Sequence, residues 1–357
     1  MLTYPCRCGA TLFFENVRCL ACGRDCGWCD ACRRVVAVEP TDNGAWRCAG
    51  QGCGATLAFC KNRTQYDACN ALVDSPGSFC RSCQATTLAP NLDDPELLGR
   101  WRAMETAKRR LLYGLDTLGI GWEASNPPLT FRFPADTADE HHTTGHQDGV
   151  VTINLKEADS VERERARQRF GEPHRTLIGH LRHEASHWLW QVFVQGQREG
   201  EFGFVFGDHN RPPYAEAMPR YYEQGPPDDW QERHISRYAA SHPWEDFAET
   251  AAFYLDMRAV LETVAHQFGY HPPAGDDAGA LLATYQQLGV GLNEVNRALG
   301  LTDALPEVVS KRVADKVAWV HELLSQNTPA WPNGAGTGRA PAPAAGPSRR
   351  GAAGPGR

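Results

Sequence analysis

The chain has 357 residues, a formal net charge of −7 and a hydrophobic content of 42%. This length is enough for one large and one small domain, and the acidic balance excludes a general attraction to nucleic acid or anionic lipid. No apolar run reaches the roughly 18 residues of a transmembrane helix, and the first residues lack the pattern of a signal peptide. We therefore expect a cytoplasmic protein without membrane contact.

All thirteen cysteines lie between Cys6 and Cys83, which marks residues 1–90 as a separate region. In a reducing compartment, closely spaced cysteines indicate metal ligands before disulfides. Four thiolates make a closed structural zinc site, and the bound ions would supply folding energy that so small a region lacks. Twelve of the cysteines sort into three such groups: Cys6, Cys8, Cys19 and Cys22; Cys29, Cys32, Cys48 and Cys53; Cys60, Cys69, Cys80 and Cys83. We therefore predict zinc ribbons with about three structural ions.

The role of Cys26 and the nature of the cysteine cluster each have more than one interpretation. Cys26 is left over and could replace a neighbour in the middle group. The alternative to zinc binding is a redox-active or unstructured cysteine cluster. Residues 1–90 carry nine Lys or Arg against seven Asp or Glu, and each thiolate site adds negative charge. We therefore expect the ribbons to contact a protein, or to cover the rest of the chain, rather than bind nucleic acid.

Helical periodicity from Pro95 to Gly119 opens the middle region, which covers residues 91–327. Two strands, Leu129–Phe133 and Val150–Leu155, are predicted next, joined by a polar loop that contains glycine. A long helix is then predicted from Pro173 to Val194. Further helices are predicted over Tyr214–Tyr222, Trp230–Ala240, Pro243–His266, Ala278–Leu299 and Pro306–Ser325.

Residues 328–357 consist almost entirely of Pro, Ala, Gly, Ser, Thr and Arg. Such a composition cannot bury a core, so this tail is predicted to be disordered. Its four arginines without an acid would allow a weak electrostatic contact, but a solvated tail is the simpler interpretation.

The sharpest motif is HExxH at residues 183–187, inside a predicted helix. Residues four apart share one face of a helix, so the imidazoles of His183 and His187 can bind one zinc ion. Glu184 then lies beside the metal, where it can act as a general base on water. The alternative is a solvated helix with incidental histidines. Apolar neighbours argue for burial instead: Leu181, Trp188, Leu189 and Val192.

A zinc hydrolase usually has a third protein ligand and one open position. The metzincin pattern is excluded, because Trp190 and Phe193 stand where glycine and histidine would be required. The helix that begins at Pro243 offers Glu245, Asp246 and Glu249 instead. Glu245 and Glu249 share one face, whereas Asp246 points about 100° away. We predict that Glu245 is the ligand and that Glu249 accepts a hydrogen bond from a ligating histidine.

The segments GHLRHEASH, VVTINL and HPWEDFAETAAFYL together resemble the bacterial zinc-ribbon-containing zinc-binding metallopeptidase family. The second part of the chain also resembles gluzincins of the lethal-factor type, which carry a Glu-x-x-x-Glu helix. In that type a tyrosine seven residues before the ligand glutamate assists catalysis, and Tyr238 occupies this position relative to Glu245. The resemblance implies an α+β fold in which a zinc-ribbon head precedes a mainly helical, zincin-like peptidase domain with a small sheet.

The expected function is hydrolysis of a peptide bond by a zinc metallopeptidase that uses one catalytic and about three structural zinc ions. Glu184 is the expected base and Tyr238 the donor to the developing oxyanion. The rival from another class is a non-catalytic adaptor that binds a partner through its ribbons. Retention of Glu184 between the two histidines argues against the adaptor, because a structural site needs no base. A zinc hydrolase of a non-peptide amide is a second rival.

Overall fold

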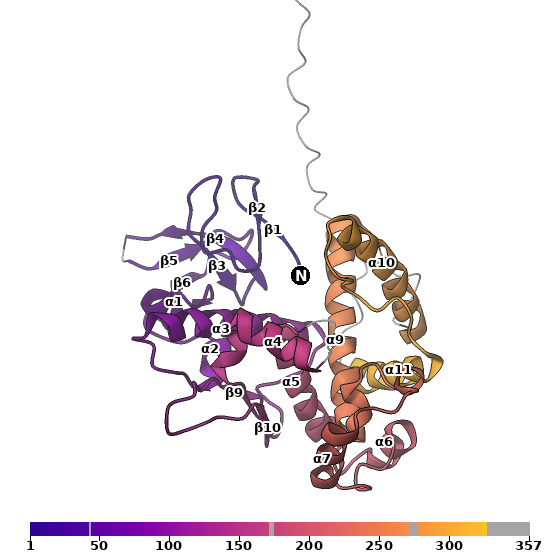
Figure 1. Ribbon diagram of the computed structural model, residues 1–357. Helices are drawn as coiled ribbons and strands as arrows, with labels where there is room; N and C mark the ends of the chain where they lie inside the picture. Colours follow the sequence, from indigo (N-terminus) through magenta and orange to yellow (C-terminus); the bar gives the residue numbers. More distant parts are fainter. Residues whose placement is uncertain (43, 171–174, 271–276, 327–357) are drawn as a thin grey trace, which may run out of the picture.

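The computed structural model describes residues 1–42, 44–170, 175–270 and 277–326. A cysteine-rich, strand-containing head precedes a mainly helical region with a small sheet, so the predicted α+β architecture is confirmed (Figure 1). None of the described helices is both long and apolar enough to cross a membrane. The tail predicted at residues 328–357 lies outside the described residues.

The head consists of short antiparallel strands held close to cysteine-bearing turns. A two-stranded sheet pairs β1 with β2, and a second sheet has the order β3-β4-β5-β6-β7. Little apolar surface is buried apart from the cysteines themselves and a few aliphatic and aromatic side chains such as Val35, Val38 and Leu72. The elements are β1 Tyr4–Pro5, β2 Thr11–Leu12, β3 Cys26–Cys29, β4 Arg34–Pro40, β5 Trp46–Cys48, β6 Thr56–Phe59, α1 Lys61–Tyr66, β7 Leu72–Val73 and α2 Arg81–Gln84.

The sheet of the second region has four strands in the order β10-β11-β9-β8. They are β8 Thr86–Leu88, β9 Thr130–Arg132, β10 Gly145–Gln147 and β11 Val150–Thr152. β9 and β11 lie inside the two predicted strands and pair in parallel. The prediction of a polar loop between them was wrong in part, because this segment contains β10, which pairs antiparallel with β11 and forms one edge of the sheet. β8 pairs with β9, so this sheet begins before residue 91.

Helices make up the rest of the second region. They are α3 Pro95–Thr117, α4 Ser160–Phe170, α5 Leu177–Phe193, α6 Glu199–Phe206, α7 Tyr214–Gln224, α8 Trp230–Arg233, α9 Pro243–Phe268, α10 Ala278–Ala298 and α11 Lys311–Ser325, with 3-10 turns η1 Leu155–Ala158 and η2 Tyr238–Ser241. The sequence did not predict α4 or α6. The single helix predicted over Trp230–Ala240 was wrong: His234 adopts an extended conformation after α8, and the chain turns again only at η2.

The core forms where α5 crosses the N-terminal half of α9, the long orange helix in Figure 1. Trp188 from α5 and Phe247 and Tyr254 from α9 are fully buried, and the strands add Phe131. Burial of large side chains of this kind contributes roughly 1.5–3 kcal/mol each. The crossing therefore holds the middle of α5 firmly against the first turns of α9.

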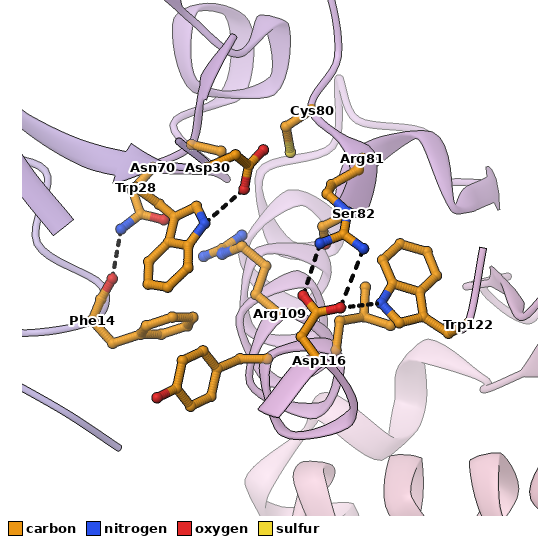
Figure 2. Close-up of a pocket in the computed structure, with 13 residues that line it drawn as sticks. Phe14, Trp28, Asp30, Asn70, Cys80, Arg81, Ser82, Arg109, Asp116 and Trp122 are labelled. Carbon is orange, nitrogen blue, oxygen red and sulfur yellow. Dashed lines mark hydrogen bonds and ion pairs between the residues drawn. The ribbon is translucent and has the colours of Figure 1, made fainter. Parts of the chain in front are cut away.

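The head packs against α3 at the seam between the two regions, where Figure 2 shows Arg81 directed toward Asp116. Arg81, next to a cysteine of the third group, donates to both oxygens of Asp116 on α3, and Trp122 Nε1 donates to the same carboxylate. Across the seam Trp28 of β3 contacts Tyr113 of α3, with ring centroids 5.8 Å apart. The small cavity between these groups, about 50 Å³, is walled by both regions.

Candidate metal centre

The helix α5 presents the HExxH residues toward α9. Thr176 caps its N-terminus, because its side chain accepts a hydrogen bond from the backbone N–H of Gly179. α9 starts with Pro243 at its first position, and the side chain of His242 caps it by accepting from the N–H of Trp244. The start of α9 at Pro243 places Glu245 in the first turn of this helix, where it faces His183 and His187 in the middle of α5.

Three donor atoms converge between the two helices. His183 Nε2 and His187 Nε2 lie 3.2 Å apart, and Glu245 Oε2 lies 3.1 Å from the first and 3.4 Å from the second. A tetrahedral zinc with bonds of about 2.0–2.1 Å holds neighbouring donors about 3.3–3.4 Å apart. The triangle of His183, His187 and Glu245 therefore has the dimensions of three corners of a zinc site.

The burial and charge of these groups fit a cation as well. All three side chains are at least nine-tenths buried, and Glu245 Oε2 has no hydrogen-bond partner in the described part of the chain. An unpartnered buried carboxylate oxygen is costly unless it binds a positive charge. Burial alone would lower the pKa of His183, but the facing carboxylates of Glu245 and Glu249 outweigh burial and hold it well above its ordinary value. The donor set is thus one that zinc fits.

Neighbouring side chains orient both Glu245 and His183. Glu249 Oε1 lies 2.6 Å from His183 Nδ1, which leaves Nε2 of this ring directed to the triangle. The hydroxyl of Ser236 donates to the other oxygen of Glu249 at 2.6 Å. Tyr214 donates to Glu245 Oε1 at 2.7 Å, so only Oε2 faces the histidines. Such outer contacts fix the ring orientation and raise ligand basicity.

Glu184 lies next to the triangle without belonging to it. Its side chain is only 8% exposed. Burial alone would raise the pKa of Glu184, but His180, His183 and His187 outweigh burial and lower it. Glu184 is therefore a carboxylate at neutral pH, which is the form that a general base requires.

Tyr238 begins η2 and reaches the same centre. Its ring centroid lies 5.8 Å from that of His183. Burial, and then the negative charge of Glu245, raise the pKa of Tyr238. The phenol is therefore protonated at neutral pH and can donate a hydrogen bond.

The structure separates the remaining candidates. Asp246 pairs with Lys316 and lies 3.1 Å from His234 Nδ1, so it faces the core and not the triangle. His242 caps α9, because its Nδ1 accepts a hydrogen bond from the backbone N–H of Trp244.

Sequence reasoning missed Tyr214, Ser236 and His146, whose ring stacks 6.5 Å from that of His187. Tyr214 begins α7 and Ser236 lies between α8 and η2, and neither belongs to a sequence motif. His146 lies on β10, a strand that the sequence did not predict.

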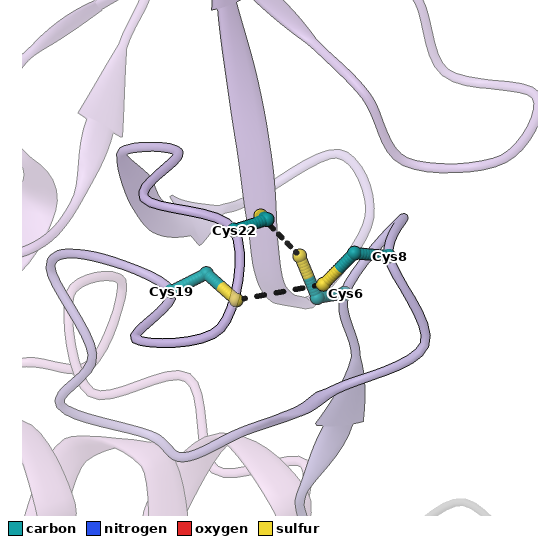
Figure 3. Close-up of side chains that lie close together, drawn as sticks. All are labelled: Cys6, Cys8, Cys19 and Cys22. Carbon is teal, nitrogen blue, oxygen red and sulfur yellow. Dashed lines mark hydrogen bonds between the residues drawn. The ribbon is translucent and has the colours of Figure 1, made fainter.

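The structure brings the cysteines together in the same three groups of four that their spacing predicts, with all sulfur atoms of a group within 4.8 Å of one another. In the first group the Sγ atoms of Cys6 and Cys22 are 3.8 Å apart and those of Cys8 and Cys19 are 3.7 Å apart (Figure 3). Zinc–sulfur bonds of about 2.3 Å give a tetrahedral edge of about 3.8 Å, whereas a disulfide would be about 2.05 Å long. Cys26 stands outside all three groups, where its thiol donates to the carbonyl of Arg24 at 3.5 Å.

Comparisons with known proteins agree with this geometry. The model of the family described as "Putative zinc-binding metallo-peptidase" matches residues 97–323, and a zinc-ribbon domain model matches residues 3–94. The chain is 34% identical over 338 residues to uncharacterized proteins of Mycobacterium tuberculosis and Mycobacterium bovis, with 90% of this chain and 94% of each relative covered. No solved structure matches the chain. Both family matches and the cysteine clusters support zinc binding, and the chain belongs to the family described as putative zinc-binding metallo-peptidases.

Proposed function

We propose that this chain is a zinc-dependent metallopeptidase that hydrolyses a peptide bond. The observation that carries the proposal is a buried carboxylate, Glu184, beside a triangle of three zinc donors that it does not complete. Three protein donors leave one position of a tetrahedral site open, which is the arrangement of catalytic rather than structural zinc. A closed adaptor-type site would have a fourth protein ligand and no use for a base.

The zinc donors, Glu184 and Tyr238 have separate roles in the proposed hydrolysis. Zinc, when bound by His183, His187 and Glu245, supplies a Lewis acid. Glu184 takes the proton of the attacking water and passes it to the leaving amine. Tyr238 donates a hydrogen bond to the oxygen on which negative charge develops, a contribution that is strongest in a site from which water is excluded.

We infer that the substrate is a peptide or protein and that the ribbons contact protein rather than nucleic acid. Support comes from charge, since the head is only mildly basic and its thiolate sites add negative charge. A cytoplasmic location agrees with thirteen cysteines none of which forms a disulfide.

A proteome cleavage screen tests the function. The zinc-loaded chain is incubated with a denatured cell extract, and new peptide N-termini are identified by mass spectrometry. Reproducible new termini that disappear in the Glu184→Gln chain support the proposal. A fully zinc-loaded chain that yields no new termini in native or denatured extracts contradicts it.

About four zinc ions per chain are expected, one at the histidine centre and three in the head. Replacement of Cys80 and Cys83 by serine should unfold the head, because these thiols are buried, while the histidine centre keeps its ion. Metal analysis together with hydrogen exchange measures both effects. Cys26→Ser is the matched control and should keep all ions, since Cys26 belongs to no group. A stoichiometry of one or less in carefully prepared protein rules out the ribbon assignment.

Tyr238→Phe should lower kcat and leave zinc affinity unchanged, because its hydrogen bond matters mainly in the transition state. A loss of roughly 100-fold in kcat is expected from removal of one oxyanion donor. The matched control is Tyr270→Phe, whose hydroxyl contacts Gln287 near the far end of α9. Unchanged kcat in the Tyr238 variant on a validated substrate would remove Tyr238 from the mechanism.

A further inference from the structure

A second group of charged side chains contacts Glu184 and contains none of the three donors of the triangle. His180 precedes Glu184 by one turn of α5, so the two side chains share a face of the helix. His180 Nε2 lies 3.5 Å from Glu184 Oε1. On its other side, His180 Nδ1 lies 3.6 Å from Glu157 Oε2. The imidazole therefore stands between two carboxylates from different elements.

Glu157 is held where it can reach His180. It lies on η1, which is capped by the side chain of Asn154, a residue that is 1% exposed and bonded to the carbonyl of His142. Arg175, just before α5, approaches Glu157 with its Nη2 3.4 Å from Oε2. The order from the metal centre outwards is thus Glu184, His180, Glu157 and Arg175.

These four side chains form a chain of alternating charge in a poorly solvated place. Their exposed fractions are 8% for Glu184, 18% for His180, 14% for Glu157 and 17% for Arg175. Buried charges of one sign are costly unless opposite charges compensate them. The two contacts of His180 are ion pairs and not hydrogen bonds, since its Nδ1 has no hydrogen-bond partner in the described residues. Only the doubly protonated, positively charged imidazole is attracted to both carboxylates at once. The group thus balances to zero net charge when His180 is an imidazolium.

We propose that His180 is a positioning residue for the general base, held by Glu157 so that it engages Glu184 Oε1 and leaves the other oxygen of Glu184 free for the reacting water. This inference rests on the proposed peptidase function. His180 touches neither zinc ligand nor substrate in this scheme; it acts by fixing one rotamer of Glu184. The distances of 3.5 and 3.6 Å are those of a resting site, and catalytic contacts commonly tighten when substrate binds.

The kinetic test compares His180→Leu, which removes both donors, with His180→Gln, which keeps one. On a peptide cleaved by the wild type, His180→Leu should lower kcat about 10- to 100-fold, the loss typical of an outer positioning contact, with KM within about twofold. His180→Gln should recover part of the loss. Zinc content should stay at the wild-type value in both. His266→Leu, at the exposed end of α9, is the matched control and should leave kcat unchanged.

Glu157→Gln provides a variant that leaves α5 intact. It should lower kcat less than His180→Leu does, and it should add nothing in the double variant, because both residues act through Glu184. Additive losses in the double variant would indicate general structural damage and would overturn the proposal. An unchanged kcat in His180→Leu with normal zinc content would overturn it as well.

A readout without substrate separates this inference from the function itself. Side-chain ¹⁵N NMR of the zinc-loaded full chain should show His180 with both nitrogens protonated at neutral pH. Glu157→Gln and Glu184→Gln should each shift it toward the neutral ring, since the carboxylates of Glu157 and Glu184 face it and Arg175 pairs with Glu157. A neutral His180 in the wild type overturns the proposal. If no peptide is cleaved, the peptidase function fails, and the NMR result alone decides whether this ionic chain exists.

Discussion

The Glu184→Gln chain is expected to lose nearly all hydrolysis while it keeps its fold and its zinc. Glutamine has the shape of glutamate but cannot accept the proton of the attacking water. General acid–base catalysis contributes roughly 10²–10⁴-fold, so the loss in kcat should fall in this range or above. Zinc should remain, because the donors are His183, His187 and Glu245 and the ligand triangle does not include Glu184.

The measurement is kcat on a validated peptide together with zinc per chain and a thermal unfolding curve. Glu201→Gln, an exposed change on α6, is the matched control for loss of one carboxylate and should retain full activity. Because Glu184 is buried among histidines, its neutral replacement also removes their partner. Inactivity that coincides with zinc loss would therefore mean that Glu184 acts on metal binding, contrary to the proposed role.

The meeting of His183, His187 and Glu245 could be predicted because each half of this cluster is a local pattern. HExxH sets two histidines four residues apart, and Glu245 and Glu249 repeat that spacing on a second apolar helix. The structure brings His183, His187 and Glu245 together and turns Glu249 toward His183. Neither pattern alone predicts that the two helices meet, because at least 58 residues separate the histidines from Glu245. Their meeting follows from the burial of both helices, which leaves their carboxylates needing partners.

The groups that orient the centre could not be predicted, since they depend on where the chain departs from periodicity. The apolar and polar spacing of Trp230–Ala240 favours one helix, but the helix ends at Arg233. That break lets Ser236 reach Glu249 and lets Tyr238 stand beside His183. Lys316 of α11 stabilises the break by donating to the carbonyl of Arg233. A contact from a helix 83 residues away cannot be read from local sequence.

Short strands and solvated helices were missed for a different reason. β10 has three residues, and its Gly-His-Gln sequence has no strand propensity of its own. It forms because β11 offers it an antiparallel partner. α4 is rich in charge and lacks an apolar face, so periodicity gives no signal. In the head, by contrast, cysteine spacing alone predicted which sulfur atoms lie together, because closely spaced pairs of cysteines on turns bring their thiols close whichever strands form between them.

Glu245→Ala is expected to lower the zinc affinity of the histidine centre far more than Glu249→Ala. Glu245 Oε2 is one of three donors and has no other partner in the described residues, so its removal leaves two histidines. Glu249 only orients His183 through Nδ1, and loss of such a contact typically costs 10- to 100-fold in metal affinity. This range corresponds to about 1.4–2.8 kcal/mol of binding free energy. The Glu245 variant should lie clearly beyond it.

Titration with a competing chelator measures the difference, because the histidine centre should release one ion separately from the ions of the thiolate groups. Asp246→Asn is the matched control: this neighbour on α9 pairs with Lys316 in the core, so its loss should lower the unfolding temperature but not the zinc affinity of the folded chain. Equal losses in the Glu245 and Glu249 variants would contradict the assignment of Glu245 as ligand. A larger loss in Glu249→Ala would reverse the two roles, with Oε1 of Glu249 as the donor. The contact of Tyr214 with Glu245 Oε1 argues against that reversal, because it already holds Glu245 with Oε2 directed at both histidines.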